Sequence, residues 1–73
     1  MGRLAGISGG RAVAAFCRAG FIVTRQKGSH AIPRKSGKPP LIIPAHRSVA
    51  PFLFRSQIRR AGLSEEQFLD LLK

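Results

Sequence analysis

The pattern of apolar and polar positions in the first third of the chain predicts a helix followed by a strand. Apolar residues recur at helical spacing over residues 9–19, and Ser8, just before them, is a favourable N-cap. Gly20 can adopt the left-handed conformation of a C-terminal cap, so it ends this helix. The β-branched and aromatic segment FIVTRQ at 21–26 then predicts a strand. The helix positions expected to face the core are Val13, Phe16 and Cys17.

Two turns divide the next segment into two further short strands. Lys27-Gly28 predicts a tight turn, after which residues 29–34 return antiparallel to the first strand. Proline donates no ladder hydrogen bond, so Pro33 makes this second strand short or places it at an edge there. A second turn at 35–38 leads to a third strand at 41–43, bounded by prolines.

The last third of the chain predicts two helices. Pro51 suits the first turn of a helix running to about Ala61, because its missing N–H would be unpaired there anyway. Gly62 stops this helix. Ser64 and Gln67 then have the spacing of a capping box, which begins a short final helix. The apolar positions of that helix are Phe68, Leu69, Leu71 and Leu72.

These elements are expected to form one α+β domain over residues 1–73, with residues 1–7 as a loose leader. A chain of this length buries only about 60% of the surface that its unfolded form exposes, so its core is small. Any chemistry must therefore lie in a shallow groove or on a sheet surface. The expected core positions are Phe21, Val23, Ile43, Phe54, Ile58 and Leu69.

Charge divides the chain into a long basic part and a short acidic end. Thirteen Lys and Arg side chains against three acids leave a net charge of +10. The acids are Glu65, Glu66 and Asp70, and residues 1–63 hold twelve of the basic side chains without one acid. These charges have almost nothing to pair with inside the chain, so a polyanion is the expected partner, with nucleic acid as first candidate. An acidic protein is the second candidate, and a merely solvated basic surface is the third.

The remaining composition indicates a cytoplasmic protein. Cys17 is the single cysteine, so it cannot form a disulfide within the chain, and its place on an apolar helical stripe predicts a core position. No stretch approaches the roughly 18 consecutive apolar residues of a membrane-spanning helix, and no signal-peptide pattern is present. We therefore expect no membrane partner.

Histidine is the residue type best able to carry chemistry in this chain. The two histidines and three acids have no metal-ligand spacing, and no carboxylate lies near either histidine, so we expect neither a metal site, nor a triad, nor a cofactor. RNA supplies its own nucleophile, the 2′-hydroxyl, so one imidazole can move the proton while Lys or Arg binds the phosphate. His30 meets these demands better than His46. Arg25 and Lys27 lie just before it around a glycine turn, whereas His46 lies in a polar loop at 45–50, where a structural or merely exposed role is expected.

Three segments together resemble the HicA family of toxin ribonucleases. They are AGFIVTRQKGSH at 19–30, LIIPAH at 41–46 and IRRAGLSEEQFLDLL at 58–72, and they occur in the family's order. The resemblance implies a fold like the double-stranded-RNA-binding domain, with helices on one face of a three-stranded antiparallel sheet. It also implies an mRNA substrate, a HicB-like antitoxin as partner, and catalysis by the histidine of the GSH motif, which is His30.

The leading hypothesis is therefore the toxin of a type II toxin–antitoxin system, an endoribonuclease that needs no metal ion. In this hypothesis His30 is the general acid or base, and the antitoxin covers it and the basic face with an acidic surface. The RNA backbone would be bound by Arg25, Lys27, Gly28, Ser29 and Arg34. The alternatives are a catalytically silent RNA-binding module of the same fold and a basic protein-interaction domain.

The sequence differs from the family pattern at several positions. Ala31 stands where many relatives carry a second histidine or a larger side chain, and Pro33 replaces an ordinary strand residue. Gln57 occupies an apolar position, and the first two residues of the Phe-Leu-Phe run at 52–54 replace a Gly-Thr pair. One helix face cannot bury all three of these apolar side chains, so at least one is expected to be exposed unless the final helix covers it.

Overall fold

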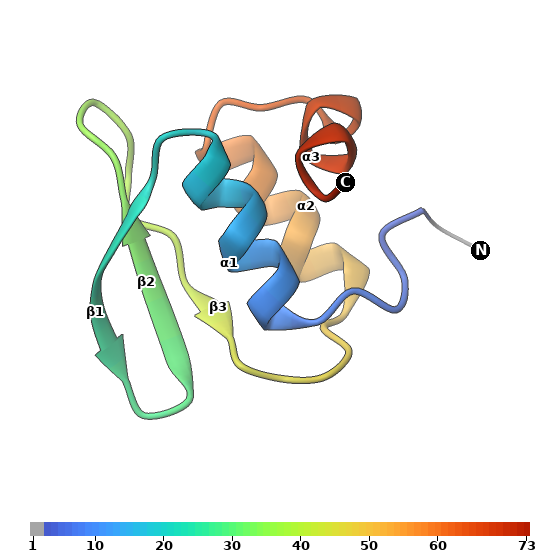
Figure 1. The fold of residues 1–73 in the computed structure, drawn as a ribbon, viewed down its shortest axis with the longest axis horizontal. Coiled ribbons are helices and arrows are strands. Elements are labelled where there is room, and N and C mark those ends of the chain that lie inside the picture. Colours follow the sequence, from blue (N-terminus) through green and yellow to red (C-terminus); the bar gives the residue numbers. More distant parts are fainter. Residues whose placement is uncertain (1–2) are drawn as a thin grey trace.

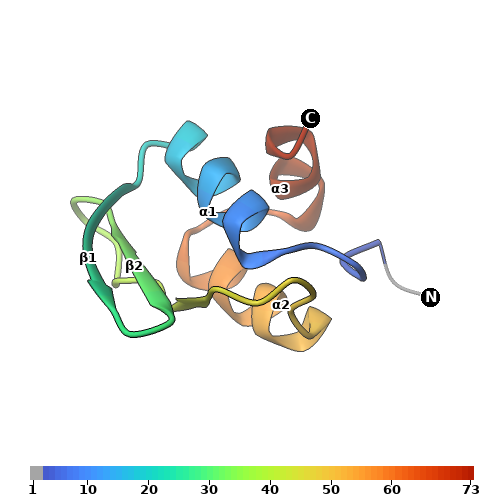
Figure 2. The ribbon, with the colours of Figure 1, turned by 60° about the horizontal axis from the view of Figure 1, so that its bottom comes forward.

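The computed structural model describes residues 3–73, which form three helices and a three-stranded antiparallel sheet (Figure 1). In chain order the elements are α1 (Gly9–Arg18), β1 (Ile22–Lys27), β2 (His30–Arg34), β3 (Ile43–Pro44), α2 (Pro51–Arg60) and α3 (Glu65–Leu71). The two views in Figures 1 and 2 place the helices on one side of the sheet. The expected α+β class is confirmed, and α1 and α2 end within one residue of their predicted ends.

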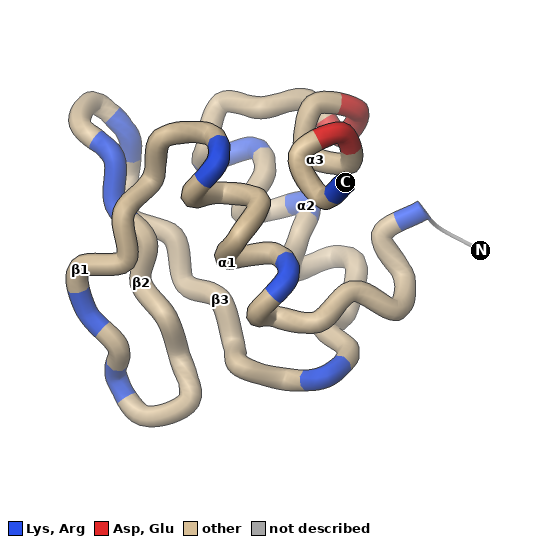
Figure 3. Tube along the Cα trace, viewed as in Figure 1, with Lys and Arg blue, Asp and Glu red and all other residues tan. Residues whose placement is uncertain are grey.

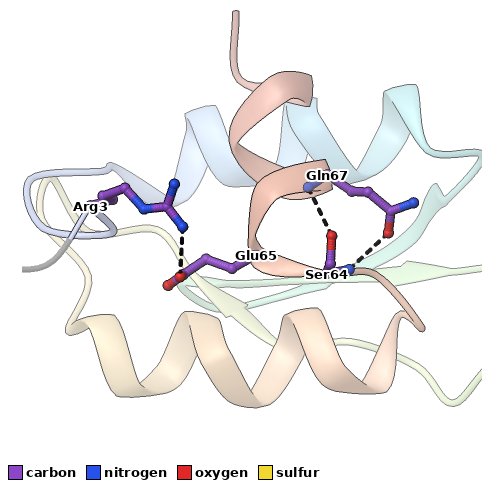
Figure 4. Close-up of polar contacts among 4 residues, drawn as sticks. All are labelled: Arg3, Ser64, Glu65 and Gln67. Atoms are coloured by element: carbon purple, nitrogen blue, oxygen red, sulfur yellow. Dashed lines mark hydrogen bonds and ion pairs between the residues drawn. The ribbon is translucent and has the colours of Figure 1, made fainter.

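The helix ends are capped by the residues that the sequence indicates. Ser8 Oγ accepts a hydrogen bond from the Arg11 N–H at 3.1 Å, and Gly20 follows α1 with a φ of +100°. At the start of α3, Ser64 Oγ accepts from the Gln67 N–H while Gln67 Oε1 accepts from the Ser64 N–H (Figure 4). This reciprocal pair is the predicted capping box, and caps of this kind typically contribute about 1 kcal/mol each.

β1 and β2 form a hairpin closed by a two-residue turn. Lys27 pairs with His30, and Gly28 between them has a φ of +61°, which suits glycine at the first position of a type II′ turn. The strand order β1-β2-β3 makes β2 the central strand. β3 is short and pairs only with the start of β2. It begins at Ile43, two residues later than the predicted start of the third strand at residue 41.

Both prolines of the sheet occupy positions where a missing N–H is tolerated. The Pro33 carbonyl accepts a hydrogen bond from the Leu41 N–H at 3.0 Å, beyond the residues of β2 that pair with β3. Since a strand residue directs its N–H and C=O to the same side, the absent donor of Pro33 faces the side where the β3 ladder has ended. Pro44 lies inside β3, whereas the sequence predicted that it bounds the strand. Its missing N–H is tolerated because the next ladder bond is donated by the Ala45 N–H, to the Ser29 carbonyl at 2.6 Å.

Four phenylalanines from different parts of the chain meet in the core between the sheet and the helices. Phe16 on α1 packs against Phe21 with ring centroids 5.9 Å apart, and against Phe68 of α3 at 5.0 Å. Phe68 also packs against Phe54 of α2 at 5.9 Å. All four side chains are at most 2% exposed, so they form the centre that joins the three helices.

Four side chains that were expected in the core lie at its margin or outside it. Val23 is 36% exposed, because β1 is an edge strand that is exposed along its whole length. Val13 and Leu69 are half-buried at the margin of the core. Cys17 is exposed, because α1 turns the side that carries Phe16 inward and Cys17 follows on the next position around the helix.

The family departures on α2 have clear structural places. Phe54 is buried while Phe52 is 66% exposed, which confirms that the helix cannot bury the whole apolar run. Leu53 is half-buried. Gln57 is buried, and its Oε1 accepts a hydrogen bond from the Ile42 N–H at 3.0 Å. The amide thus satisfies a main-chain donor that has no strand partner, which an apolar side chain could not do.

The segment expected to be a loose leader, residues 1–7, packs against the domain in the part that the structure describes. Leu4 and Ile7 are buried members of the core, and the Ile7 carbonyl accepts a hydrogen bond from the Val49 N–H at 3.0 Å. Burial of these two apolar side chains stabilises the packed position of the segment, although the segment has no helix or strand. Residues 1–2 lie outside the described residues.

Gly9 allows the start of α1 to touch the chain after β3, and its replacement tests this contact. Its N–H donates to the His46 carbonyl at 2.9 Å, and a Cβ at this position would lie 1.9 Å from the Pro44 carbonyl oxygen. We expect Gly9→Ala to lower the free energy of unfolding by about 1–3 kcal/mol, because main chain must move to relieve the overlap. Denaturant unfolding of the two variants measures this.

Gly10→Ala is the matched control, because a Cβ there meets nothing within 4 Å. In a helix, alanine is favoured over glycine by about 0.5–1 kcal/mol, so this variant should be at least as stable as the parent chain. Equal stability of the two variants would contradict the close approach at Gly9.

Candidate nucleic-acid interface

The face of the sheet that points away from the helices carries a cluster of basic side chains. Side chains alternate between the faces along a strand, and paired residues on neighbouring strands share a face. Burial along β2 places Ala31 and Pro33 on the helix side. The opposite, open face therefore holds the other β2 side chains and their β1 partners, which are His30, Ile32, Arg34, Lys27, Arg25 and Ile22.

His30 begins β2, and its side chain is exposed at the end of the hairpin. Lys27 is its direct partner on β1, and Arg25 follows two residues away on the same face. Arg34 lies four residues further along β2, a distance of about 13 Å at the rise of an extended strand. The structure thus brings Lys27 and Arg25 near His30 and places Arg34 at the other end of the open face.

The turn before His30 presents main chain rather than side chains. A Cβ on Gly28 would meet nothing within 4 Å, so open space surrounds this residue, and its positive φ disfavours any other side chain. Ser29 is exposed, and its carbonyl is held by the Ala45 N–H. A ligand can therefore approach the backbone at the turn closely, while the turn itself is tied to the segment after β3.

The charge distribution makes this face part of a basic surface. Figure 3 shows Lys and Arg along the hairpin and on the other elements, whereas Asp and Glu lie only on α3. Among residues 3–73 the ion pairs are Arg3–Glu65 at 3.1 Å, drawn in Figure 4, and Lys73–Asp70 at 3.4 Å, both exposed. Neither pair includes a side chain of the open face, so the positive charges there are available to an external anion. Exposed pairs of this kind also contribute little to stability.

Other basic side chains have structural partners that the sequence did not reveal. Lys35 Nζ donates to the Ala19 carbonyl at 2.8 Å, where it places a positive charge at the C-terminus of α1. Arg18 donates to the Leu71 carbonyl at the end of α3. These residues can be distinguished from the free charges of the open face only by their tertiary contacts, because the sequence does not show which lysine or arginine has a structural partner.

Two of the hollows in the structure lie beside the sheet or α2, and both lie away from His30. One, of about 200 Å³, lies between the start of α1 and the helix side of the sheet. Ala31 lines it, so a larger side chain at this position would occupy part of the hollow. The other, of about 330 Å³, lies beside α2 and is lined by Arg55 and Arg59 together with Glu65. His30 lines neither hollow and its side chain is exposed, so the candidate site lies on the surface of the sheet.

The described residues carry no metal-ligand cluster. Within residues 3–73, no three His, Cys, Asp or Glu side chains are grouped so that they could hold an ion. None of the helices in this part of the chain has the length and apolar character to cross a membrane. The groups available for chemistry on the open face are therefore an imidazole, ammonium and guanidinium groups, and the main chain of the turn.

Comparison with known proteins gives a family match that covers most of the chain. The family model described as the HicA toxin of bacterial toxin–antitoxin systems matches residues 9–63, a span that includes α1, the whole sheet and α2. No curated protein matches the chain. The matched span contains every residue of the basic cluster on the open face.

Proposed function

The chain belongs to the HicA family of toxins from bacterial toxin–antitoxin systems, and we propose that it is an endoribonuclease that cleaves mRNA with His30 as a general acid or base. The observation that carries the proposal is the exposed imidazole of His30 directly beside Lys27 on an open, basic sheet face. The family match supplies the biological setting, and the arrangement of these two side chains supplies the chemistry.

The reaction is a transesterification that needs little from the protein. The 2′-hydroxyl loses its proton and attacks the adjacent phosphorus, the bond from phosphorus to the 5′-oxygen breaks, and that oxygen gains a proton. The products are a 2′,3′-cyclic phosphate and a free 5′-hydroxyl. His30 moves one of these protons, an effect worth about 10²–10⁴ in rate, and the Lys27 ammonium offsets the charge that develops on the phosphoryl oxygens.

The remaining basic residues of the open face bind and position the RNA backbone. Arg25 lies next to the reacting phosphate, and Arg34 contacts a phosphate further along the same strand of RNA. The main chain at Gly28 and Ser29 lets one phosphate approach the turn closely. Contacts of this kind orient the RNA without identifying its bases.

An antitoxin resembling HicB is the proposed protein partner. The free basic charges of the open face need a polyanion or an acidic protein, and an acidic surface laid over His30 would exclude RNA from it. We place both the activity and its inhibition in the cytoplasm, where the mRNA substrate is found. The chain therefore needs no membrane partner for this function.

Cleavage in the presence of a chelator tests the proposed function. We expect the purified chain to cut a single-stranded mRNA in EDTA as fast as in magnesium, because imidazole and lysine carry the chemistry. Expression of the chain in growing bacteria should stop growth and degrade mRNA. RNA that is bound but never cut would favour the silent RNA-binding module. Absence of salt-sensitive RNA binding would favour the protein-interaction domain.

A further inference from the structure

We propose that His46 is a second catalytic side chain, and that it forms an acid–base pair with His30 across one phosphodiester. This inference rests on the proposed ribonuclease function and adds to it the group that completes the proton transfers. A transesterification at phosphorus moves two protons, one from the 2′-oxygen and one to the 5′-oxygen. A single imidazole in one position serves one of these oxygens well, so a second group is needed on the opposite side of the phosphorus.

The pairing of β2 and β3 brings His46 to the end of the sheet that carries His30. Pro44 is the direct partner of His30. The Ala45 N–H donates to the Ser29 carbonyl at 2.6 Å, so the antiparallel register continues one residue past the end of β3. In the same register, His46 lies opposite the turn that precedes His30.

The hydrogen bonds of this segment also determine the side to which His46 points. The carbonyl of His46 accepts from the Gly9 N–H, and the carbonyl of Pro44 lies against Gly9 as well. The Ala45 N–H points the other way, to β2. The carbonyls of Pro44 and His46, two residues apart, thus face the same neighbour, as in extended backbone, where residues two apart also project their side chains to the same side. His46 therefore projects to the side of Pro44 and of His30.

The expected separation suits a shared phosphate. In an antiparallel pair, diagonal neighbours such as His30 and His46 have Cα atoms about 7–8 Å apart, within reach of aromatic and long side chains. Imidazoles on two such residues can approach one phosphorus from opposite sides. Both side chains are exposed, so RNA can enter between them.

The structural contact of His46 is made by its main chain, which leaves the imidazole available. Its carbonyl holds the start of α1 through Gly9, and this bond persists whatever side chain stands at position 46. Positive groups adjoin both histidines: Lys27 faces His30 from β1, and the exposed Arg47 follows His46 in the chain. These cations stabilise the additional negative charge on the phosphorane that forms during the reaction.

The two imidazoles divide the proton transfers between them. One, unprotonated, takes the proton of the 2′-hydroxyl as the 2′-oxygen bonds to phosphorus. The other, protonated, gives its proton to the 5′-oxygen as the bond from phosphorus to that oxygen breaks. The two histidines end with their protonation states exchanged, and proton exchange with water restores them before the next turnover.

A substrate with a leaving group that needs no proton tests the pair. We compare His46→Gln, His30→Gln and the control Ser48→Ala, an exposed position in the same loop. One substrate is an oligoribonucleotide with the ordinary phosphodiester at a mapped cleavage site. The other carries sulfur in place of the 5′-bridging oxygen at that site. Each histidine variant should cut the ordinary substrate about 10²–10⁴-fold more slowly, and Ser48→Ala should cut it normally.

The sulfur substrate then separates a catalytic role from a structural one. A thiolate leaves without protonation, so the variant that lacks the general acid should regain most of its rate, and the variant that lacks the base should not. A pH–rate profile should lose one limb in each variant, since each limb reports one of the two groups. Rescue of one variant alone supports the pair and identifies the acid.

Other outcomes overturn the inference without touching the proposed function. A His46→Gln variant that cuts RNA at the normal rate leaves His30 to act without it. If His46→Gln loses rate equally on both substrates and keeps the same pH profile, the effect of the replacement is structural. If the sulfur substrate rescues neither variant, neither histidine is the general acid. If the unmodified chain fails to cut either substrate, it is the ribonuclease proposal that fails.

Discussion

Replacing His30 with alanine is expected to abolish growth arrest and to slow RNA cleavage by about 10²–10⁴-fold. On β1 and β2, the other side chains of the open face are Lys27, arginines and aliphatic residues, so the imidazole of His30 is the general acid or base that these two strands supply. Its removal leaves the phosphate contacts in place, so affinity for RNA should change little. Growth, mRNA integrity and binding of a 2′-deoxy-substituted RNA measure the three effects.

The control for this experiment is Thr24→Ala, an exposed position on β1 that pairs with no residue of β2. This variant should be as toxic as the unmodified chain, and both variants must accumulate to equal levels. Equal toxicity of His30→Ala would show that His30 is the wrong residue. If neither the unmodified chain nor His30→Ala is harmful, the departures at Ala31, Pro33 and Phe52 have disarmed the scaffold, and the silent RNA-binding module becomes the better account.

Replacing Phe68 with alanine should produce the largest loss of stability, about 3–5 kcal/mol. Its ring packs against Phe16 at 5.0 Å and Phe54 at 5.9 Å, so it joins α3 to both other helices. A natural domain typically has only about 5–15 kcal/mol of stability, and a chain this small lies at the lower end. We therefore expect the variant to be largely unfolded in mild denaturant, as far-ultraviolet circular dichroism would record.

Phe52→Ala is the matched control, because it removes the same atoms from a side chain that is 66% exposed. Its effect on the free energy of unfolding should lie within about 0.5 kcal/mol. The comparison also concerns the extent of the domain, because Phe68 lies beyond residues 9–63, which match the family model. If Phe68→Ala unfolds like Phe52→Ala, α3 is an appendage and the core ends with α2.

Local signals in the sequence were sufficient for most of the secondary structure. Ser8, Gly20 and the Ser64–Gln67 box act within a few residues of their own position, so their effect can be recognised without knowledge of the fold. The hairpin turn is of the same kind, since Gly28 needs only its neighbours to adopt a positive φ. The predicted order of helices and strands was accordingly confirmed.

Burial was less predictable, because it depends on partners far away in the chain. Cys17 and Val23 have the apolar character of core residues, yet α1 turns Cys17 outward and the edge position of β1 exposes Val23. Leu4 and Ile7 belong to no periodic apolar pattern that would predict their burial. They are nevertheless buried in the core, where the loop before α2 contacts this segment. Such outcomes follow from which elements meet, and a linear pattern does not contain that information.

The candidate site divides in the same way. His30, Lys27 and Arg25 lie within six residues, so an extended strand and a tight turn were enough to anticipate their proximity. His46 is sixteen residues from His30, and its place at the same end of the sheet follows only from the Pro44–His30 pair and the Ala45–Ser29 bond.

Sequence patterns alone were enough to predict the class of the fold, the caps and turns and the excess of positive charge, and they led to His30 as the proposed proton-transfer residue. These properties depend on side-chain chemistry and on neighbours a few residues away. In contrast, tertiary contacts determine which charges are free, which apolar side chains are buried and which face of the sheet is open. Packing and strand register settle those questions, because they bring together groups whose separation along the chain says nothing of their separation in space.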